Sequence, residues 1–138
     1  RNTIPGKVFF TIDLRHPEDA VLSKMAASAK AAAEEGAKKN GLELDFKEIW
    51  YSPPVKFDTN CVAAVKAGAE ALGMPSMPII SGAGHDACYM SRAAPTGMIF
   101  IPCEGGISHN EIENATREDC GAGCDVLLRA VVERANAV

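Results

Sequence analysis

The sequence lacks any apolar run long enough to cross a bilayer, has no excess of basic residues and contains few aromatic side chains. A membrane-spanning helix needs about 20 apolar residues, and binding to nucleic acid or anionic lipid requires a basic surface. The 138 residues carry 14 Lys and Arg against 18 Asp and Glu, a net charge of −4. These absences argue against a role on a membrane or on nucleic acid. With aromatic residues at 6%, aliphatic side chains must fill the core, as in helix-rich α/β proteins.

A signal-peptide pattern and a C-x-x-C pair are also missing. The odd number of cysteines, five, predicts reduced thiols in a cytoplasmic protein. Hydrophobic residues at 47% and charged residues at 23% predict a folded core, and the length suits one ordinary domain or pieces of two. Because the sequence begins at Arg1 without a Met, we expect it to be cut from a longer protein.

Periodicity predicts a β-α-β unit in the first part of the chain. Alternating apolar residues predict strands over residues 7–15 and 42–51. Between them, Pro17 followed by acids starts a helix predicted over residues 18–39. Pro53-Pro54 interrupts the pattern, since proline cannot donate to a ladder, and marks a segment boundary.

The second part reads as alternating helices and short apolar strands. Asp58 or Thr59 can cap a helix that Gly73 ends, and Thr116 can cap the last helix. The sequence predicts, between these helices, a short strand at Ile79-Ile80, a short helix over 86–93 and a buried strand over 98–101.

Two histidines lie in loops next to predicted apolar strands, where α/β proteins place ligands. His109 could bind zinc, manganese, cobalt or nickel through a neutral imidazole, or be a surface histidine with one backbone hydrogen bond. His85 follows a glycine-containing loop and could donate a hydrogen bond to a carboxylate or a developing oxyanion, or be a helix cap. His16 is expected to be a helix cap only.

Two further residues could either bind a substrate carboxylate or make only local contacts within their own segments. Arg15 ends a predicted strand, where its guanidinium could hold a carboxylate through two bonds. The alternative is a surface ion pair with Asp13 or Glu18, which contributes little. Asn2 could be merely a turn residue.

Five motifs, in order along nearly the whole chain, resemble those of the hydantoinase/carbamoylase family of two-metal amidohydrolases. The family comprises N-carbamoyl-L-amino-acid hydrolases, allantoate amidohydrolases and β-ureidopropionases. Each motif alone is weakly specific, whereas the ordered set is specific. The motifs are Asn2–Gly6, Asp13–Pro17, Ser81–Ala87, Pro95–Pro102 and Gly106–Glu111.

The resemblance implies an α/β chain made of parts of two domains. Residues 1–56 would be the second half of a ferredoxin-like α+β lid and dimerisation domain, through which a homodimer forms. Residues 57–138 would be the C-terminal part of an aminopeptidase-like α/β catalytic domain. The missing N-terminal half of the same protein would complete both.

The resemblance also assigns roles to four residues. His109 matches the last ligand of two divalent metal ions (zinc, or manganese, cobalt or nickel), and His85 matches a histidine that contacts substrate near the metals. Asn2 and Arg15 match lid residues that hold the substrate carboxylate. The other metal ligands would lie upstream of Arg1, so the chain would carry one ligand only.

The activity implied for the parent protein is hydrolysis of N-carbamoyl-L-amino acids to an amino acid, ammonia and carbon dioxide. Allantoate amidohydrolase and β-ureidopropionase are the close alternatives, because the same motifs would bind those ureido acids. A non-catalytic dimerisation or interaction fragment is the alternative from another class. We expect the 138 residues alone to be inactive.

Overall fold

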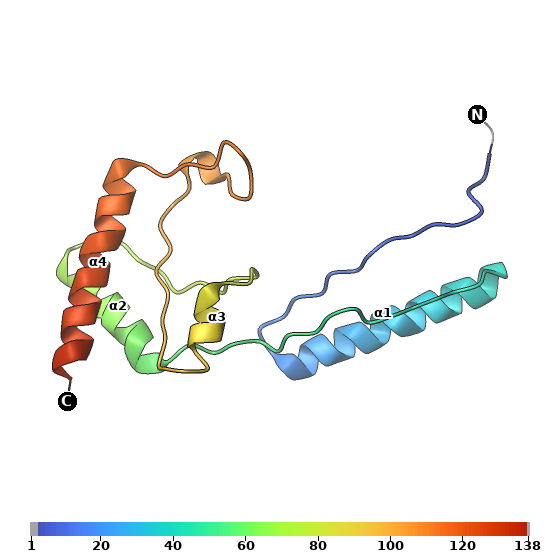
Figure 1. Cartoon of the computed structure of the whole chain (residues 1–138), viewed down its shortest axis with the longest axis horizontal. Coiled ribbons are helices and arrows are strands. Elements are labelled where there is room, and N and C mark those ends of the chain that lie inside the picture. The colour runs from blue at the N-terminus through green and yellow to red at the C-terminus, as the bar shows by residue number, and fades with distance from the viewer. Residues whose placement is uncertain (1–2, 138) are drawn as a thin grey trace. The chain divides into compact units, whose positions relative to one another are not determined.

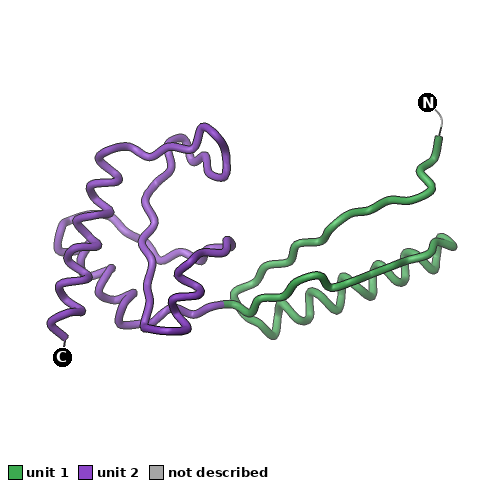
Figure 2. Tube along the Cα trace, in the orientation of Figure 1, with its two compact units in different colours: residues 1–54 green, residues 55–138 purple. Residues whose placement is uncertain are grey.

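The computed structural model describes residues 3–137 (Figure 1). The chain divides into two compact units, Arg1–Pro54 and Val55–Val138 (Figure 2). The described elements are α1 (Asp19–Asn40), α2 (Thr59–Ala71), α3 (Asp86–Met90), the short 3-10 helix η1 (Glu104–Gly106) and α4 (Arg117–Asn136). None of the described helices combines the length and the apolarity that crossing a bilayer requires.

The first unit is built around α1, which confirms the helix predicted over residues 18–39. An acidic first turn and a basic last turn complement the helix dipole. Gly41 ends the helix in the left-handed region at φ 65°, a conformation that glycine adopts without steric cost. The next backbone N–H, of Leu42, donates to Ala37 O at 2.9 Å and completes the helix stop.

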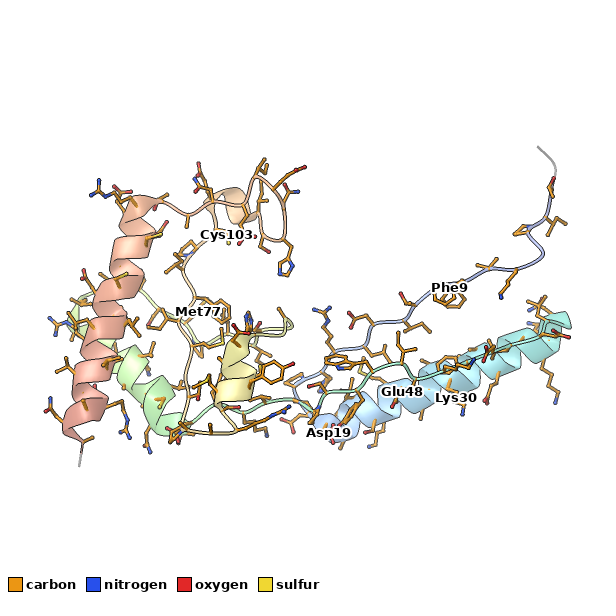
Figure 3. The ribbon with its side chains drawn as sticks, in the orientation of Figure 1. Phe9, Asp19, Lys30, Glu48, Met77 and Cys103 are labelled. Atoms are coloured by element: carbon orange, nitrogen blue, oxygen red, sulfur yellow. The ribbon has the colours of Figure 1, made fainter. Side chains whose placement is uncertain are left out.

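The strands predicted over residues 7–15 and 42–51 are wrong, because no strand is assigned anywhere in residues 3–137. Residues 7–15 precede α1 and residues 42–51 follow it, and both segments are irregular extended chain (Figure 1). Their apolar side chains lie largely in solvent. Phe9, labelled in Figure 3, is 85% exposed, and Trp50 is 77% exposed. A strand exists only when a neighbouring strand takes up its backbone hydrogen bonds, and alternation alone does not supply that neighbour.

The returning segment nevertheless follows α1. Leu42, Leu44 and Phe46 line a shallow groove together with Lys30 and Ala37 of the helix. At the far end of the segment, the Tyr51 hydroxyl donates a hydrogen bond to the carboxylate of Asp19 in the first turn of α1. The segment after α1 thus lies along the helix without forming the predicted strand.

The second unit has its core between α2 and α4, which pack side by side (Figure 1). Small residues permit a close approach: Ala64 and Ala69 of α2 and Val126 and Ala130 of α4 are buried. Gly68 lies in the same contact, where an added Cβ would stand 3.3 Å from Val126 O. This pairing is the main packed element of the described chain.

Both helices of this core begin at the caps that the sequence predicts. The Asp58 carboxylate accepts the backbone N–H groups of Asn60 and Cys61 at 3.0 and 2.9 Å. The hydrogen bond from the Cys61 backbone is the main cause that lowers the pKa of Asp58. Thr116 Oγ1 accepts the Asp119 N–H at 3.0 Å and donates to its carboxylate at 2.6 Å. The short Asp119 side chain therefore accepts a hydrogen bond from the hydroxyl of the capping residue Thr116.

The other predictions for this unit need correction. Residues 79–80 and 98–101 are irregular chain, not strands, and Ile80 is 75% exposed. These apolar runs have no strand beside them in residues 3–137, so their hydrophobicity alone does not make a sheet. The short helix ends at Met90, not at residue 93, because the following residues form a turn in which Ala93 N–H donates to Met90 O at 2.9 Å. The five cysteines are free thiols, as expected.

The contact between α4 and Ile101 requires a glycine at position 123. An added Cβ at Gly123 would stand 2.7 Å from Ile101 Cγ2, whereas Gly121 in the same helix has open space around it. Gly123→Ala is therefore expected to lower the free energy of unfolding by about 1 to 2 kcal/mol, because Ile101 must shift. Gly121→Ala should raise it by up to about 1 kcal/mol through helix propensity. Urea unfolding followed by circular dichroism measures both, and equal effects of the two substitutions would contradict this packing.

Candidate functional site

His85 is held by a side-chain contact of its own loop. Its Nε2 lies 2.7 Å from Ser81 Oγ, and its ring meets Phe100 edge-on, with the ring centroids 5.4 Å apart and the planes at 68°. His85 occupies the N-cap position of α3 in extended backbone conformation (φ −137°, ψ 156°), but its side chain makes no capping hydrogen bond. The half-buried imidazole is thus oriented by Ser81 and Phe100 and not by the helix.

Arg15 forms the surface ion pair that the sequence offered as an alternative. Arg15 Nη2 lies 2.5 Å from Asp13 Oδ2, and Arg15 Nε donates to Asp13 Oδ1 at 3.0 Å. This hydrogen bond lowers the pKa of the Asp13 carboxyl and raises the pKa of the Arg15 guanidinium. The side chains are 60% and 65% exposed, so solvent screens the attraction and the pair adds little to stability. A substrate carboxylate at these nitrogens would have to replace Asp13.

His109 lies on an exposed loop whose backbone is constrained. It has φ 55°, the left-handed region that residues other than glycine rarely adopt. The backbone N–H of His109 donates to Glu113 Oε2 at 2.6 Å. At the base of the loop, Glu104 N–H donates to Asn114 O at 2.7 Å, and Asn114 Nδ2 donates to Glu104 Oε2 at 2.7 Å. The imidazole is therefore carried on a closed loop with a defined conformation.

The described residues do not form a complete metal site. A bound zinc ion takes three or four protein ligands, and no group of three or more His, Cys, Asp or Glu side chains within residues 3–137 is placed to hold an ion. His109 can therefore contribute at most one ligand of a larger set.

The predicted site residues fall in different units. His85 and His109 belong to the second unit and Arg15 to the first, while Asn2 lies outside the described residues. His16 accepts the Glu18 N–H on Nδ1 at 2.9 Å. The expectation that His16 caps the helix is wrong, because Glu18 holds the N-cap position of α1 and no side chain caps it. Sequence reasoning assigned no role to Ser81. Its position four residues before a loop histidine was the available signal.

Comparison with known proteins identifies the family. The model for Peptidase family M20/M25/M40 matches residues 5–133, so the chain belongs to this family. Within it, the chain is similar to a hydantoinase/carbamoylase family amidase from Burkholderia multivorans, with a TM-score of 0.83 and 50% identity over 86% of this chain and 29% of that one. The resemblance inferred from the five motifs is confirmed.

Curated relatives give the same result at the level of sequence. The chain is 46% identical over 138 residues to the N-carbamoyl-L-amino-acid amidohydrolase of Rhizobium meliloti, covering 100% of this chain and 33% of that protein. It is 36% identical over 131 residues to the ureidoglycolate hydrolase of Oryza sativa subsp. japonica, covering 94% of this chain and 27% of that protein. The chain thus spans about a third of the length of the curated relatives it matches.

Proposed function

We propose that this chain is part of a metal-dependent amidohydrolase that cleaves the carbamoyl C–N bond of N-carbamoyl-L-amino acids. The products are an amino acid, ammonia and carbon dioxide. The observation that carries this proposal is the 46% identity, over the whole chain, to the R. meliloti protein named for that reaction. The activity is proposed for the complete protein, because the chain spans only a third of that relative.

The proposal divides the chain by role. Residues 1–56 form the second half of a lid and dimerisation domain, and residues 57–138 form the closing part of the catalytic domain. The boundary of the two compact units after Pro54 supports this division. A homodimer through the lid, a cytoplasmic location and association with the N-terminal part of the same protein belong to the same proposal.

Four residues act on the substrate or the metals in this proposal. Asn2 and Arg15 bind the substrate carboxylate, and the fork geometry of a guanidinium suits that task. His85 donates a hydrogen bond to a substrate oxygen, a role supported by the ring orientation that Ser81 and Phe100 impose. His109 supplies one ligand to a pair of divalent ions, zinc or manganese, cobalt or nickel, and its constrained loop supports a fixed position.

A ureido acid is the second candidate substrate, as in allantoate amidohydrolase or β-ureidopropionase. The similarity to the rice protein named ureidoglycolate hydrolase favours this candidate. A fragment that serves only dimerisation or interaction is the remaining alternative, and the lack of a three-ligand group in residues 3–137 is compatible with it.

A chimera tests the substrate. The 138 residues replace the matching third of the R. meliloti protein, and the unmodified protein is assayed beside it. Ammonia release is measured from N-carbamoyl-L-amino acids, N-carbamoyl-β-alanine, allantoate and ureidoglycolate. The highest kcat/KM with N-carbamoyl-L-amino acids is the expected result. A preference for a ureido acid that the unmodified protein lacks would move the assignment to the second candidate.

The isolated 138-residue chain is expected to be inactive. With zinc, manganese, cobalt or nickel added, its ammonia release from N-carbamoyl-L-amino acids should equal that of buffer, because one ligand does not hold a catalytic metal pair. The chimera at the same concentration is the positive control. Metal-supported turnover by the purified chain alone would show that it carries a complete site.

A further inference from the structure

Ser81 makes two contacts that together orient His85. Its Oγ lies 2.7 Å from His85 Nε2 and accepts the backbone N–H of Ala83 at 3.2 Å. The second contact fixes the hydroxyl within its own loop before α3 begins. The serine thus joins the backbone of the loop to the imidazole that the proposed function uses.

The hydrogen-bond capacities of these groups favour one tautomer of His85 when the Ser81 hydroxyl both donates and accepts. A serine hydroxyl has one proton to donate and two lone pairs to accept with. Ala83 N–H occupies one lone pair, so the contact with Nε2 can use either the second lone pair or the hydroxyl proton. Donation of the proton to Nε2 is the arrangement in which the hydroxyl both donates and accepts within the loop. When the hydroxyl donates to Nε2, the proton of a neutral imidazole resides on Nδ1, since the bond made by one ring nitrogen sets the state of the other. Nδ1 lies across the ring from Ser81 and becomes the donor.

The contact with Phe100 also restrains the imidazole ring of His85. An edge-on arrangement with centroids 5.4 Å apart is a favourable geometry for two aromatic rings. Ser81 limits the rotation of the imidazole at Nε2, and Phe100 limits its tilt. A donor preorganised in this way stabilises charge without first reorienting when that charge develops.

We propose that Ser81 is a positioning residue that holds His85 as the neutral Nδ1–H tautomer, with this N–H directed to the carbamoyl carbonyl oxygen of the substrate, where negative charge develops in the transition state. The proposal rests on the proposed function and names the atom through which His85 acts. Ser81 touches His85 and not the substrate. Its removal therefore changes how well His85 donates and leaves the binding of the rest of the substrate intact.

The kinetic test uses three serine variants of the chimera. Ser81→Ala is expected to lower kcat on the order of 10- to 100-fold with KM nearly unchanged, less than the loss of a direct oxyanion donor. Ser81→Thr keeps the hydroxyl and should restore most of kcat. Ser91→Ala is the matched control, because Ser91 Oγ donates to Cys88 O of α3 at 2.9 Å. Full activity in Ser81→Ala, or no recovery in Ser81→Thr, would overturn the proposal.

A spectroscopic test does not depend on activity. The 138-residue chain has three histidines, so ¹⁵N labelling resolves each imidazole by NMR. At a pH where His85 is neutral, Nδ1 should be protonated and Nε2 should be an acceptor, and Ser81→Ala should shift the ring toward the other tautomer. A protonated Nε2 in the unsubstituted chain would refute the proposal. If the tautomer is as expected but every chimera is inactive, the proposed function fails and the positioning contact stands.

Discussion

His109→Ala in the chimera is expected to reduce bound metal and hydrolysis together. In the proposed function this imidazole is one ligand of the metal pair, and the closed loop under it keeps its backbone in place. Loss of a residue that only hydrogen-bonds to a metal ligand already lowers metal affinity or activity by about 10- to 100-fold. Because His109 is proposed as a direct ligand, we expect metal affinity and kcat to fall by about 100-fold or more. Elemental analysis gives metal per subunit, and ammonia release gives kcat.

His16→Ala is the control for this substitution. His16 makes a local contact with the start of α1, where its Nδ1 accepts the Glu18 N–H at 2.9 Å. Removal of an imidazole at that position should leave metal content and kcat unchanged. Unaltered metal content in His109→Ala would rule out the metal role, and an equal loss in both variants would indicate a general effect on folding.

Arg15→Ala is expected to act mainly on substrate binding. A guanidinium that holds the substrate carboxylate contributes charge-assisted hydrogen bonds, and their removal should lower kcat/KM on the order of 10- to 100-fold. Most of the change should appear in KM, because the carboxylate is bound equally in the ground state and the transition state. Steady-state kinetics of the chimera with an N-carbamoyl-L-amino acid measures both constants.

Two controls separate this role from the ion pair with Asp13. A substrate analogue whose carboxylate is replaced by an amide should react equally well with the Arg15→Ala chimera and the unsubstituted one. Arg92→Ala removes a guanidinium that lies 5.2 Å from the Tyr89 ring centroid, and it should leave KM unchanged. If Arg15→Ala impairs the acid and the amide equally, Arg15 does not bind the carboxylate.

The helices could be predicted from the sequence because their signals are local. Pro17 and Gly41 bracket α1, Asp58 caps α2 and Thr116 caps α4, and each signal acts within a few residues of the helix end. The structure places the helix termini within a residue or two of these positions. Local hydrogen bonds and backbone preferences are sufficient to determine them.

The strands could not be predicted in the same way. Residues 7–15 carry the alternation of a half-buried strand, yet Phe10 is 67% exposed. Alternation describes the two faces of a strand and carries no information on the strand that would pair with it. The buried strand predicted over residues 98–101 fails for the same reason. Phe100 contacts the ring of His85 and is not part of a sheet.

The loop positions of the candidate site residues could be predicted from the sequence, whereas the contacts of their side chains could not. The loop position of His85 singled it out, whereas the serine that fixes its ring depends on side-chain rotamers that periodicity does not determine. Arg15 was expected to bind either a substrate carboxylate or Asp13, and the structure shows the latter pair. The left-handed backbone of His109 had no signal at that residue, because glycine is the residue usually found there.

The most direct measurement of the central claim is the kcat/KM of the unsubstituted chimera for an N-carbamoyl-L-amino acid. If these 138 residues supply the substrate-binding and metal-binding side chains proposed for them, the value should lie within about 100-fold of that of the unmodified R. meliloti protein. Circular dichroism and the oligomeric state establish that the chimera is folded. A folded chimera with no detectable hydrolysis of any N-carbamoyl or ureido acid would contradict the account.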